Sequence, residues 1–396
     1  MVINAPLLFT LTTGQGFVMD SKSLLLFIAG SVAPSFVIAL WATFVVRYYA
    51  AAWGLIDQPG ERKVHVTPTP RGGGLAIWLG VVGTFAIGQL LLLLASYVPA
   101  IQAMIPDFAQ EHVAGIWSQS AKLWIILAGG TALTLLGLMD DRGGLSWQLR
   151  LAAEFGVAAI CVWLVPNLRL TAFIDAPLVT GALSVLWIVA LINSFNMLDN
   201  MDALSGGVAA IAASMLAAVL LLAPDPQTQR PQLFVAGLLL VVVGGILGFL
   251  WHNRPPAKIF MGDAGAYFIG FLIAVATLLA SYTGYHSPTR HAILAPLCVM
   301  AVPLYDMTSV ILIRLASGKS PFQPDKNHFS HRLVDLGLTK TQAVLTVYLT
   351  TATCGLGALL LHQVEWTGAI VIMLMIGCVL SLIGVLEATA RRTIKG

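Results

Sequence analysis

About eleven long apolar runs, each of roughly 17 to 24 residues, divide this chain and limit what it can fold into. A helix of that length spans the ~30 Å of hydrocarbon in a lipid bilayer. Of the 396 residues, 58% are hydrophobic and only 10% are charged, so the chain lacks the polar surface of a soluble globule. The sequence therefore predicts an all-α fold, a polytopic transmembrane helical bundle.

The runs follow one another without a repeat or a soluble segment, so we expect one integral membrane domain over residues 1–396. The first run begins only at Leu24 and is long enough to span, so we expect no cleavable signal peptide. The four cysteines lie in or beside apolar runs without metal-ligand spacing, and we expect them to be small core residues. The predicted spans are 24–46, 73–96, 123–139, 149–165, 181–196, 203–223, 233–251, 264–282, 293–313, 343–361 and 368–386.

The distribution of Lys and Arg predicts how the bundle sits in the membrane. Sixteen of the 21 fall in one set of connections and five in the other, and cytoplasmic loops are the ones that carry excess positive charge. An odd number of spans then places the N-terminus outside and the C-terminus in the cytoplasm. Because the basic residues are scattered and the net charge is only +3, we expect no nucleic-acid partner.

Polar residues of the kinds that bind metals and phosphates gather on the predicted cytoplasmic side. The positive-inside rule accounts for the basic ones but not for the carboxylates. Together they predict a metal and phosphate site at that membrane face. The five clusters are Arg62, Lys63 and His65 with Arg71 to Gly74; Asp140, Asp141 and Arg150; Asn196, Asp199 and Asp202; Lys258 with Gly262 to Gly265; and Asp325, Lys326, His328, His331 and Arg332.

Two of the clusters are mainly acidic. Asp140 and Asp141 close a span, where the helix dipole disfavours each carboxylate by about 0.3 to 1 kcal/mol. Asn196, Asp199 and Asp202 recur every three residues, which predicts one shared face of a helical turn, and residues 170–229 contain no Lys or Arg to pair with them. A cation with oxygen ligands would relieve both clusters. The plainer alternatives are a solvated helix exit and a polar turn between spans.

Two further clusters also have two explanations. Asp263 stands where a span begins and suits a helix N-cap, yet Lys258 and the neighbouring glycines suit anion binding at a helix N-terminus. His328, His331 and Arg332 have the donors to bind a pyrophosphate, or they belong to a positive-inside anchor.

Short motifs containing these clusters occur in a fixed order between residues 57 and 340. They are Asp57-Gln-Pro, Arg62-Lys-Val-His65, Pro70-Arg-Gly-Gly, Gly137-Leu-Met-Asp-Asp-Arg142, Asn193-Ser-Phe-Asn-Met-Leu-Asp199, Lys258-Ile-Phe-Met-Gly-Asp-Ala-Gly265 and Pro324-Asp-Lys-Asn-His328. In this order they resemble the polyprenyl-phosphate N-acetylhexosamine-1-phosphate transferases of glycosyltransferase family 4. The number of spans is more similar to the GlcNAc-1-phosphate branch of that family than to its pentapeptide branch.

The resemblance implies that a sugar 1-phosphate, GlcNAc-1-phosphate in the first instance, passes from a UDP-amino sugar to undecaprenyl or another polyprenyl phosphate. UMP is released, and the lipid diphosphosugar initiates cell-envelope polysaccharide synthesis. The resemblance also implies Mg²⁺ as cofactor, with Mn²⁺ as a substitute, and a multi-pass position in the inner (plasma) membrane. The active site is then cytoplasmic, and a homodimer is one expected arrangement.

The resemblance also implies roles for individual residues. Arg150 would contact the lipid phosphate beside Asp140 and Asp141, and Asp202 would face the nucleotide sugar. The implied metal ligands are Asn196 and Asp263. The implied catalytic residues are Asp140, Asp141, Asp263 and His328. The implied substrate-binding residues are Lys63, His65, Arg150, Asp199, Asp202, Lys258, His331 and Arg332.

Four residues depart from the family pattern. Asn200 and Ala203 stand in place of two glycines, Ala266 in place of a serine, and Ser330 in place of the middle histidine of three. These departures keep open the alternative of an inactive relative that binds polyprenyl phosphate without turnover.

A membrane transporter is the other alternative. It would place ionisable residues near the bilayer midplane. Glu154 and Asp306 both lie inside apolar runs, without an obvious partner in the sequence.

Overall fold

A computed structural model describes residues 20–58, 68–170, 174, 176–223, 225–282, 289–323, 325 and 327–395. Over these residues, ten helices are long and apolar enough to cross a membrane, and a bent pair of shorter helices makes an eleventh. The predicted all-α membrane bundle of about eleven spans is therefore confirmed. Each predicted span corresponds to one of these helices, and the predicted span 293–313 is the bent pair.

Besides the helices, the described residues form a single two-stranded sheet. The elements, in chain order, are α1 (Ser21–Tyr49), β1 (Ile56–Asp57), β2 (Thr69–Pro70), α2 (Gly73–Ala95), α3 (Pro99–Gln102), α4 (Asp107–Gln110), α5 (Val113–Gly143), α6 (Trp147–Leu164), α7 (Pro177–Leu198), α8 (Leu204–Leu222), α9 (Leu233–Asn253), α10 (Gly262–Leu279), η1 (Arg290–Leu294), α11 (Ala295–Val299), α12 (Ala301–Ala316), α13 (Phe329–Asp335), α14 (Lys340–Leu360) and α15 (Trp366–Lys395).

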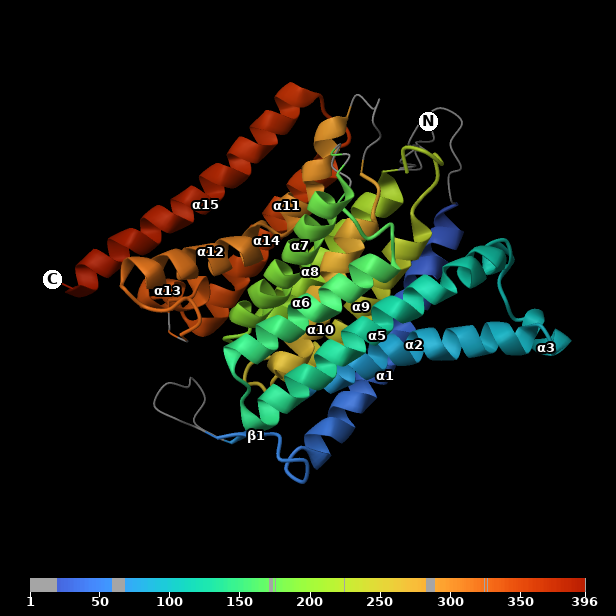
Figure 1. The fold of residues 1–396 in the computed structure, drawn as a ribbon, viewed down its shortest axis with the longest axis horizontal. Coiled ribbons are helices and arrows are strands. Elements are labelled where there is room, and N and C mark those ends of the chain that lie inside the picture. Colours follow the sequence, from blue (N-terminus) through green and yellow to red (C-terminus); the bar gives the residue numbers. More distant parts are fainter. Residues whose placement is uncertain are drawn as a thin grey trace, which may run out of the picture.

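Helix α10 forms the centre of the bundle and packs against α2, α5, α7, α8 and α9. Its residues from Ala264 to Leu278 are all buried, as expected for a helix that is apolar all round. Helix α15 runs along the outside of the bundle (Figure 1) and keeps a largely exposed apolar surface. That surface has the character of one that faces lipid.

Helices α11 and α12 meet at a bend of 64°. Pro303 lies in the first turn of α12 and has no backbone N–H to donate to the carbonyl of Val299. The helical hydrogen bonds therefore break between Val299 and Ala301, which is where the bend lies.

Two glycines allow α10 to begin in close contact with α2 and α5. A Cβ atom at Gly74 would lie 2.0 Å from the backbone nitrogen of Gly265, and one at Gly137 would lie 2.3 Å from that of Ala264. Neither position has room for a side chain, because the neighbouring atoms are rigid backbone. The start of α10 is thus fixed against both helices by backbone contact.

We predict that Gly137→Ala lowers the free energy of unfolding by about 2 kcal/mol or more, because the added methyl must push α5 and α10 apart. The midpoint of thermal unfolding in detergent measures this effect. Gly143→Ala is the matched control, since a Cβ there has no neighbour within 4 Å. Equal midpoints for the two variants would contradict the close contact.

Candidate active site

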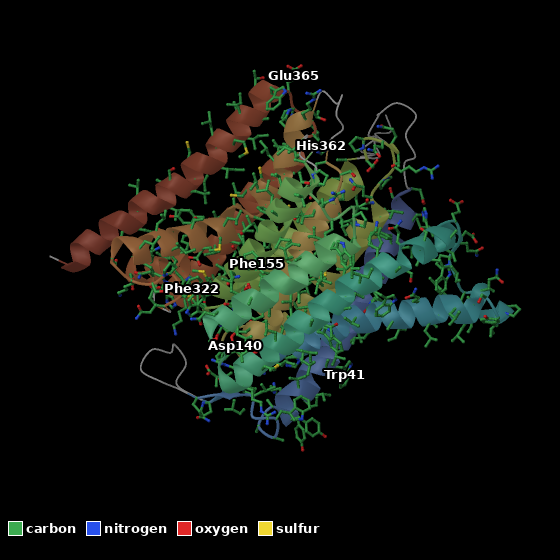
Figure 2. All side chains as sticks on the ribbon, viewed as in Figure 1. Trp41, Asp140, Phe155, Phe322, His362 and Glu365 are labelled. Atoms are coloured by element: carbon green, nitrogen blue, oxygen red, sulfur yellow. The ribbon has the colours of Figure 1, made fainter. Side chains whose placement is uncertain are left out.

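A cavity of about 410 Å³ opens where the ends of several helices meet. It lies at the end of the bundle that includes Asp140, opposite the end with His362 and Glu365 (Figure 2). We call it the acidic cavity. Its lining residues are Asp57, Arg71, Asp141, Asp199, Asn200, Met201, Asp202, Asn253, Pro255, Phe260, Gly262, Asp263, Asp325, His331, Lys340 and Val344.

Asp141 caps the N-terminus of α10. Its Oδ1 accepts a hydrogen bond from the backbone N–H of Asp263 at 3.1 Å, and its Oδ2 accepts one from that of Ala264 at 3.3 Å. These N–H groups have no partner within their own helix, which explains why a carboxylate stands at the unfavourable end of α5. The alternative that Asp263 is itself the N-cap is wrong, because Met261 occupies that position and the cap comes from another helix.

The two predicted metal ligands are in contact. The side-chain nitrogen of Asn196, near the end of α7, donates to Asp263 Oδ1 at 2.6 Å. The other carboxylate oxygen of Asp263 lies 3.8 Å from Arg150 Nη1. Side chains from α6 and α7, far apart in the sequence, therefore converge on the Asp263 carboxylate of α10.

Asp140 holds Arg150 in this group. Asp140 Oδ2 lies 2.7 Å from Arg150 Nη1, and its Oδ1 accepts a hydrogen bond from the backbone N–H of Leu145 at 2.5 Å. The hydroxyl of Tyr267 donates to Asp140 Oδ2 at 3.4 Å. Asp140 is buried and outside the lining of the acidic cavity, so the two adjacent aspartates have different surroundings.

The predicted helical face of Asn196, Asp199 and Asp202 is wrong, because α7 ends at Leu198. Asp199 and Asp202 instead belong to the tight turn between α7 and α8, residues 199–203. Asp202 Oδ2 accepts a hydrogen bond from the backbone N–H of Ala257 at 2.9 Å. Ala203 ends the turn in the left-handed conformation, with φ of 63°. The turn therefore forms although alanine stands where the family has glycine.

Two of the departures from the family pattern contact each other. The hydroxyl of Ser330 in α13 donates to Asn200 Oδ1 at 2.5 Å, and Asn200 Nδ2 donates to the carbonyl of Met197 at 3.0 Å. Both ends of the Asn200 amide are thus bound by the protein, and the 199–203 turn is tied to α13. Ala266 is fully buried in α10.

The predicted basic cluster divides in the structure. His331 lines the acidic cavity. His328 is buried, with Nδ1 2.9 Å from Asp306 Oδ2. Arg332 is also buried, and its Nε lies 3.1 Å from Glu387 Oε2 of α15. His328 and Arg332 therefore support α13 rather than line the cavity.

The remaining predicted binding residues lie elsewhere. Lys258 is exposed beside the cavity, outside its lining. Lys63 and His65 fall outside the described residues, so their roles stay predictions.

Six polar residues of the cavity lining had no predicted catalytic, binding or metal role: Asp57, Arg71, Asn200, Asn253, Asp325 and Lys340. Asp57 and Arg71 belong to the first matching motifs, and that signal was available in the sequence. Asn253 was not recognisable, because its role depends on the folded turn. Its Oδ1 accepts a hydrogen bond from the backbone N–H of Ala203 at 2.8 Å.

Negative charge dominates the acidic cavity. Among the described residues that line it, six are aspartates, whereas two, Arg71 and Lys340, are permanent cations. Burial raises the pKa of Asp199 to about 7, and the nearby Asp141 carboxylate acts in the same direction. For Asp325, burial acts upward, but hydrogen bonds from Arg314 and Asn327 outweigh it and lower the pKa to about 2.

This donor set fits a hard cation. Carboxylate and amide oxygens are the ligands that Mg²⁺ prefers. Among the described residues, no three His, Cys, Asp or Glu side chains form a ready-made metal site. An ion here would need the amide of Asn196, together with water and substrate oxygens, which is usual for Mg²⁺.

We predict that Asp199→Asn makes stability less dependent on pH. An acid whose pKa is raised on folding binds more protons folded than unfolded between about pH 4 and 7, so its contribution to stability falls as the pH rises through that window. The neutral variant lacks this loss. Thermal midpoints measured from pH 5 to 8 in EDTA should fall less steeply than in the wild type, and parallel curves would contradict the raised pKa.

Comparison with known proteins places the chain in a family. The model of glycosyl transferase family 4 matches residues 123–281, the region that includes Asp140, Asn196 and Asp263. A probable undecaprenyl-phosphate N-acetylglucosaminyl 1-phosphate transferase of Bacillus subtilis is 31% identical over 352 residues, which cover 86% of this chain and 87% of the relative.

Two further relatives agree. A decaprenyl-phosphate N-acetylglucosaminephosphotransferase of Mycobacterium tuberculosis is 34% identical over 347 residues, 81% of this chain and 79% of the relative. An undecaprenyl-phosphate alpha-N-acetylglucosaminyl 1-phosphate transferase of Salmonella typhi is 29% identical over 321 residues, 78% and 77% of the two chains. The resemblance seen in the motifs is confirmed: this chain belongs to glycosyl transferase family 4.

Proposed function

We propose that this protein transfers GlcNAc-1-phosphate from UDP-GlcNAc to undecaprenyl or another polyprenyl phosphate, releasing UMP and leaving a lipid diphosphosugar. The observation that carries the proposal is the contact of Asp141 and Asn196 with Asp263, at a cavity that Asp141 and Asp263 line. The three relatives, all named as N-acetylglucosamine-phosphate transferases that act on a polyprenyl phosphate, support it.

The chemistry of this reaction suits such a site. A phosphate monoester has a second pKa near 6, so a lipid phosphate is largely dianionic at neutral pH and attacks without a strong base. The harder requirement is to bring two anionic substrates together. Fixed cations and a metal ion meet it by offsetting charge and holding the reactants in line.

Asp263 and Asn196 are the residues that we propose hold Mg²⁺. They are already in contact, and Asp263 is one of six aspartates that line the cavity, where the described residues supply two permanent cations. A bound Mg²⁺ would neutralise phosphate charge as the bond to the leaving nucleotide breaks. We expect Mn²⁺ to substitute, because it accepts the same oxygen ligands.

Arg150 is suited to the lipid phosphate. It lies in the first turn of α6, and its neighbours Trp147 and Leu149 are 40% and 51% exposed. Asp140 fixes the guanidinium, which lies 3.8 Å from Asp263. A phosphate bound there would have hydrocarbon on one side for its polyprenyl tail and the acidic cavity on the other.

The proposal also includes the setting of the enzyme. The excess of Lys and Arg in the loops at the site end supports a plasma-membrane protein with its site on the cytoplasmic face, where nucleotide sugars are available. A lipid diphosphosugar made there would initiate a cell-envelope polysaccharide. A homodimer is an arrangement that size measurement in detergent can test.

Glu154 and Asp306, the two acids on which the transporter alternative rests, have partners in the structure. Glu154 Oε2 accepts a hydrogen bond from Asn193 Nδ2 at 2.5 Å, and Asp306 binds both His328 and the backbone N–H of Phe329. Both acids hold neighbouring elements in place. No observation therefore favours transport over transfer.

We predict that purified protein releases UMP from UDP-GlcNAc only when polyprenyl phosphate and Mg²⁺ are both present. An inactive relative would bind the lipid without releasing UMP, and a transporter would move substrate without cleaving it. A panel of UDP-sugars in the same assay identifies the preferred donor. Absence of UMP release with every donor would refute the proposal.

We predict that Asp263→Ala reduces transfer by about 1,000-fold or more, because it removes the proposed metal ligand and the carboxylate that Asn196 and Arg150 approach. Its thermal midpoint should stay close to that of the wild type, since Asp141 still caps α10. Asp335→Ala is the control, because Asp335 is an exposed acid at the end of α13 outside the cavity lining. Near-normal turnover by Asp263→Ala with Mg²⁺ would remove the metal assignment.

A further inference from the structure

Arg71 is the one arginine among the described residues that line the acidic cavity. Its Nη2 lies 2.7 Å from Asp57 Oδ1, and its Nη1 lies 3.9 Å from Asp141 Oδ1, beyond hydrogen-bonding distance. The Arg71 side chain is 31% exposed, whereas that of Asp57 is 8% exposed. Asp57 therefore holds one edge of the guanidinium, and the rest of the group faces the cavity.

The backbone around Arg71 is fixed to the start of α10. β1 and β2 pair Ile56 with Pro70, and the N–H of Arg71 donates to the carbonyl of Leu55 at 2.8 Å. The N–H of Phe260 donates to the carbonyl of Pro70 at 2.8 Å. Arg71 and the Asp263 region thus form two walls of one rigid unit, and the arginine is preorganised with respect to the proposed metal site.

The charges of the cavity show what Arg71 is suited to bind. Asp141 caps α10, Asp202 accepts from the backbone of Ala257, and Asp325 is paired with Arg314. These three acids already have partners. Among the described lining residues, however, aspartates outnumber Arg71 and Lys340, so an anion entering the cavity meets mainly negative charge. A guanidinium matches two phosphate oxygens at once, so Arg71 is the group best placed to receive a phosphate.

Position separates this phosphate from that of the lipid. Arg71 lines the acidic cavity together with the 199–203 turn, whereas Arg150 lies outside that lining, beside the exposed apolar residues of α6. The cavity, with a mostly polar lining, suits a water-soluble substrate. The two arginines therefore have different surroundings: Arg71 lines the cavity, and Arg150 lies 3.8 Å from Asp263 and outside that lining.

We propose that Arg71 binds the diphosphate of the nucleotide-sugar donor, and that Asp57 is a positioning residue that fixes the Arg71 guanidinium. This assignment rests on the proposed function and names the group that recognises its soluble substrate. Arg71 then serves the donor, and Arg150 serves the lipid phosphate.

Steady-state kinetics with each substrate varied in turn tests the proposal. Arg71→Met should raise the KM for UDP-GlcNAc and the inhibition constant of UMP by about 10- to 100-fold, the usual loss for a charge-assisted hydrogen bond to phosphate. The KM for polyprenyl phosphate should stay within about twofold. Arg142→Met is the charge-matched control, because Arg142 is exposed next to Asp141 and outside the cavity lining.

Further variants separate binding from folding. Arg71→Met breaks the ion pair of the buried Asp57 carboxylate, which can destabilise the protein. The double variant Asp57→Asn/Arg71→Met removes that buried charge and should show the same rise in donor KM with a restored thermal midpoint. Arg71→Lys should recover part of the affinity, since it keeps the charge but loses the planar fork. Asp57→Asn alone should raise the donor KM less than Arg71→Met does.

The outcomes distinguish this inference from the proposed function. If the wild type releases no UMP, the proposed function fails before any variant is compared. If the wild type is active but the donor KM of Arg71→Met matches that of Arg142→Met, the inference alone is overturned. A rise in the lipid KM with an unchanged donor KM also overturns it, since the phosphate held by Arg71 would then be that of the lipid.

Discussion

Asp141 at the end of α5 accepts two backbone hydrogen bonds from the start of α10, and the arrangement of the site depends on this contact. It is made within a close packing of α2, α5 and α10 that Gly74 and Gly137 make room for. Because the Asp141 carboxylate joins the two helices, it fixes the position of Asp263 at the start of α10. In a membrane, where unpaired N–H groups are costly, such a cap also satisfies the helix end that must lie near the interface.

Sequence patterns predicted the helices well and their ends less well. The length of the apolar runs is a direct consequence of bilayer thickness, so every span had a strong signal, including the one that Pro303 breaks. The turn after Leu198 corresponds to the alternative of a polar turn between spans, which stayed open because a three-residue spacing cannot distinguish a helical face from a helix end. Ala203 shows the limit clearly: its left-handed backbone is imposed by tertiary contacts that no local rule contains.

The sequence predicted which types of residue gather at the site, but it did not predict which side chain each of them contacts. Asn196, Asp263 and Asp141 meet, because all three lie near helix termini at the same end of the bundle. His328 and Arg332 belong to the same predicted set but are bound by Asp306, inside an apolar run, and by Glu387, at the end of one. A charge in a motif thus has two uses, binding substrate or holding the element that does. Only the folded structure distinguishes these two uses, because the use of a given charge depends on which acids are buried near it.

The ion pair between Arg332 and Glu387 has a practical consequence for handling the protein. It joins α13, which supplies His331 to the cavity, to the outermost helix, α15. A tag fused after Glu387 leaves the pair intact. A truncation before it would strand a buried guanidinium, at a typical cost of about 3 to 5 kcal/mol. The final helix, although peripheral, therefore sets how short the chain can be made while the His331 side of the acidic cavity keeps its shape.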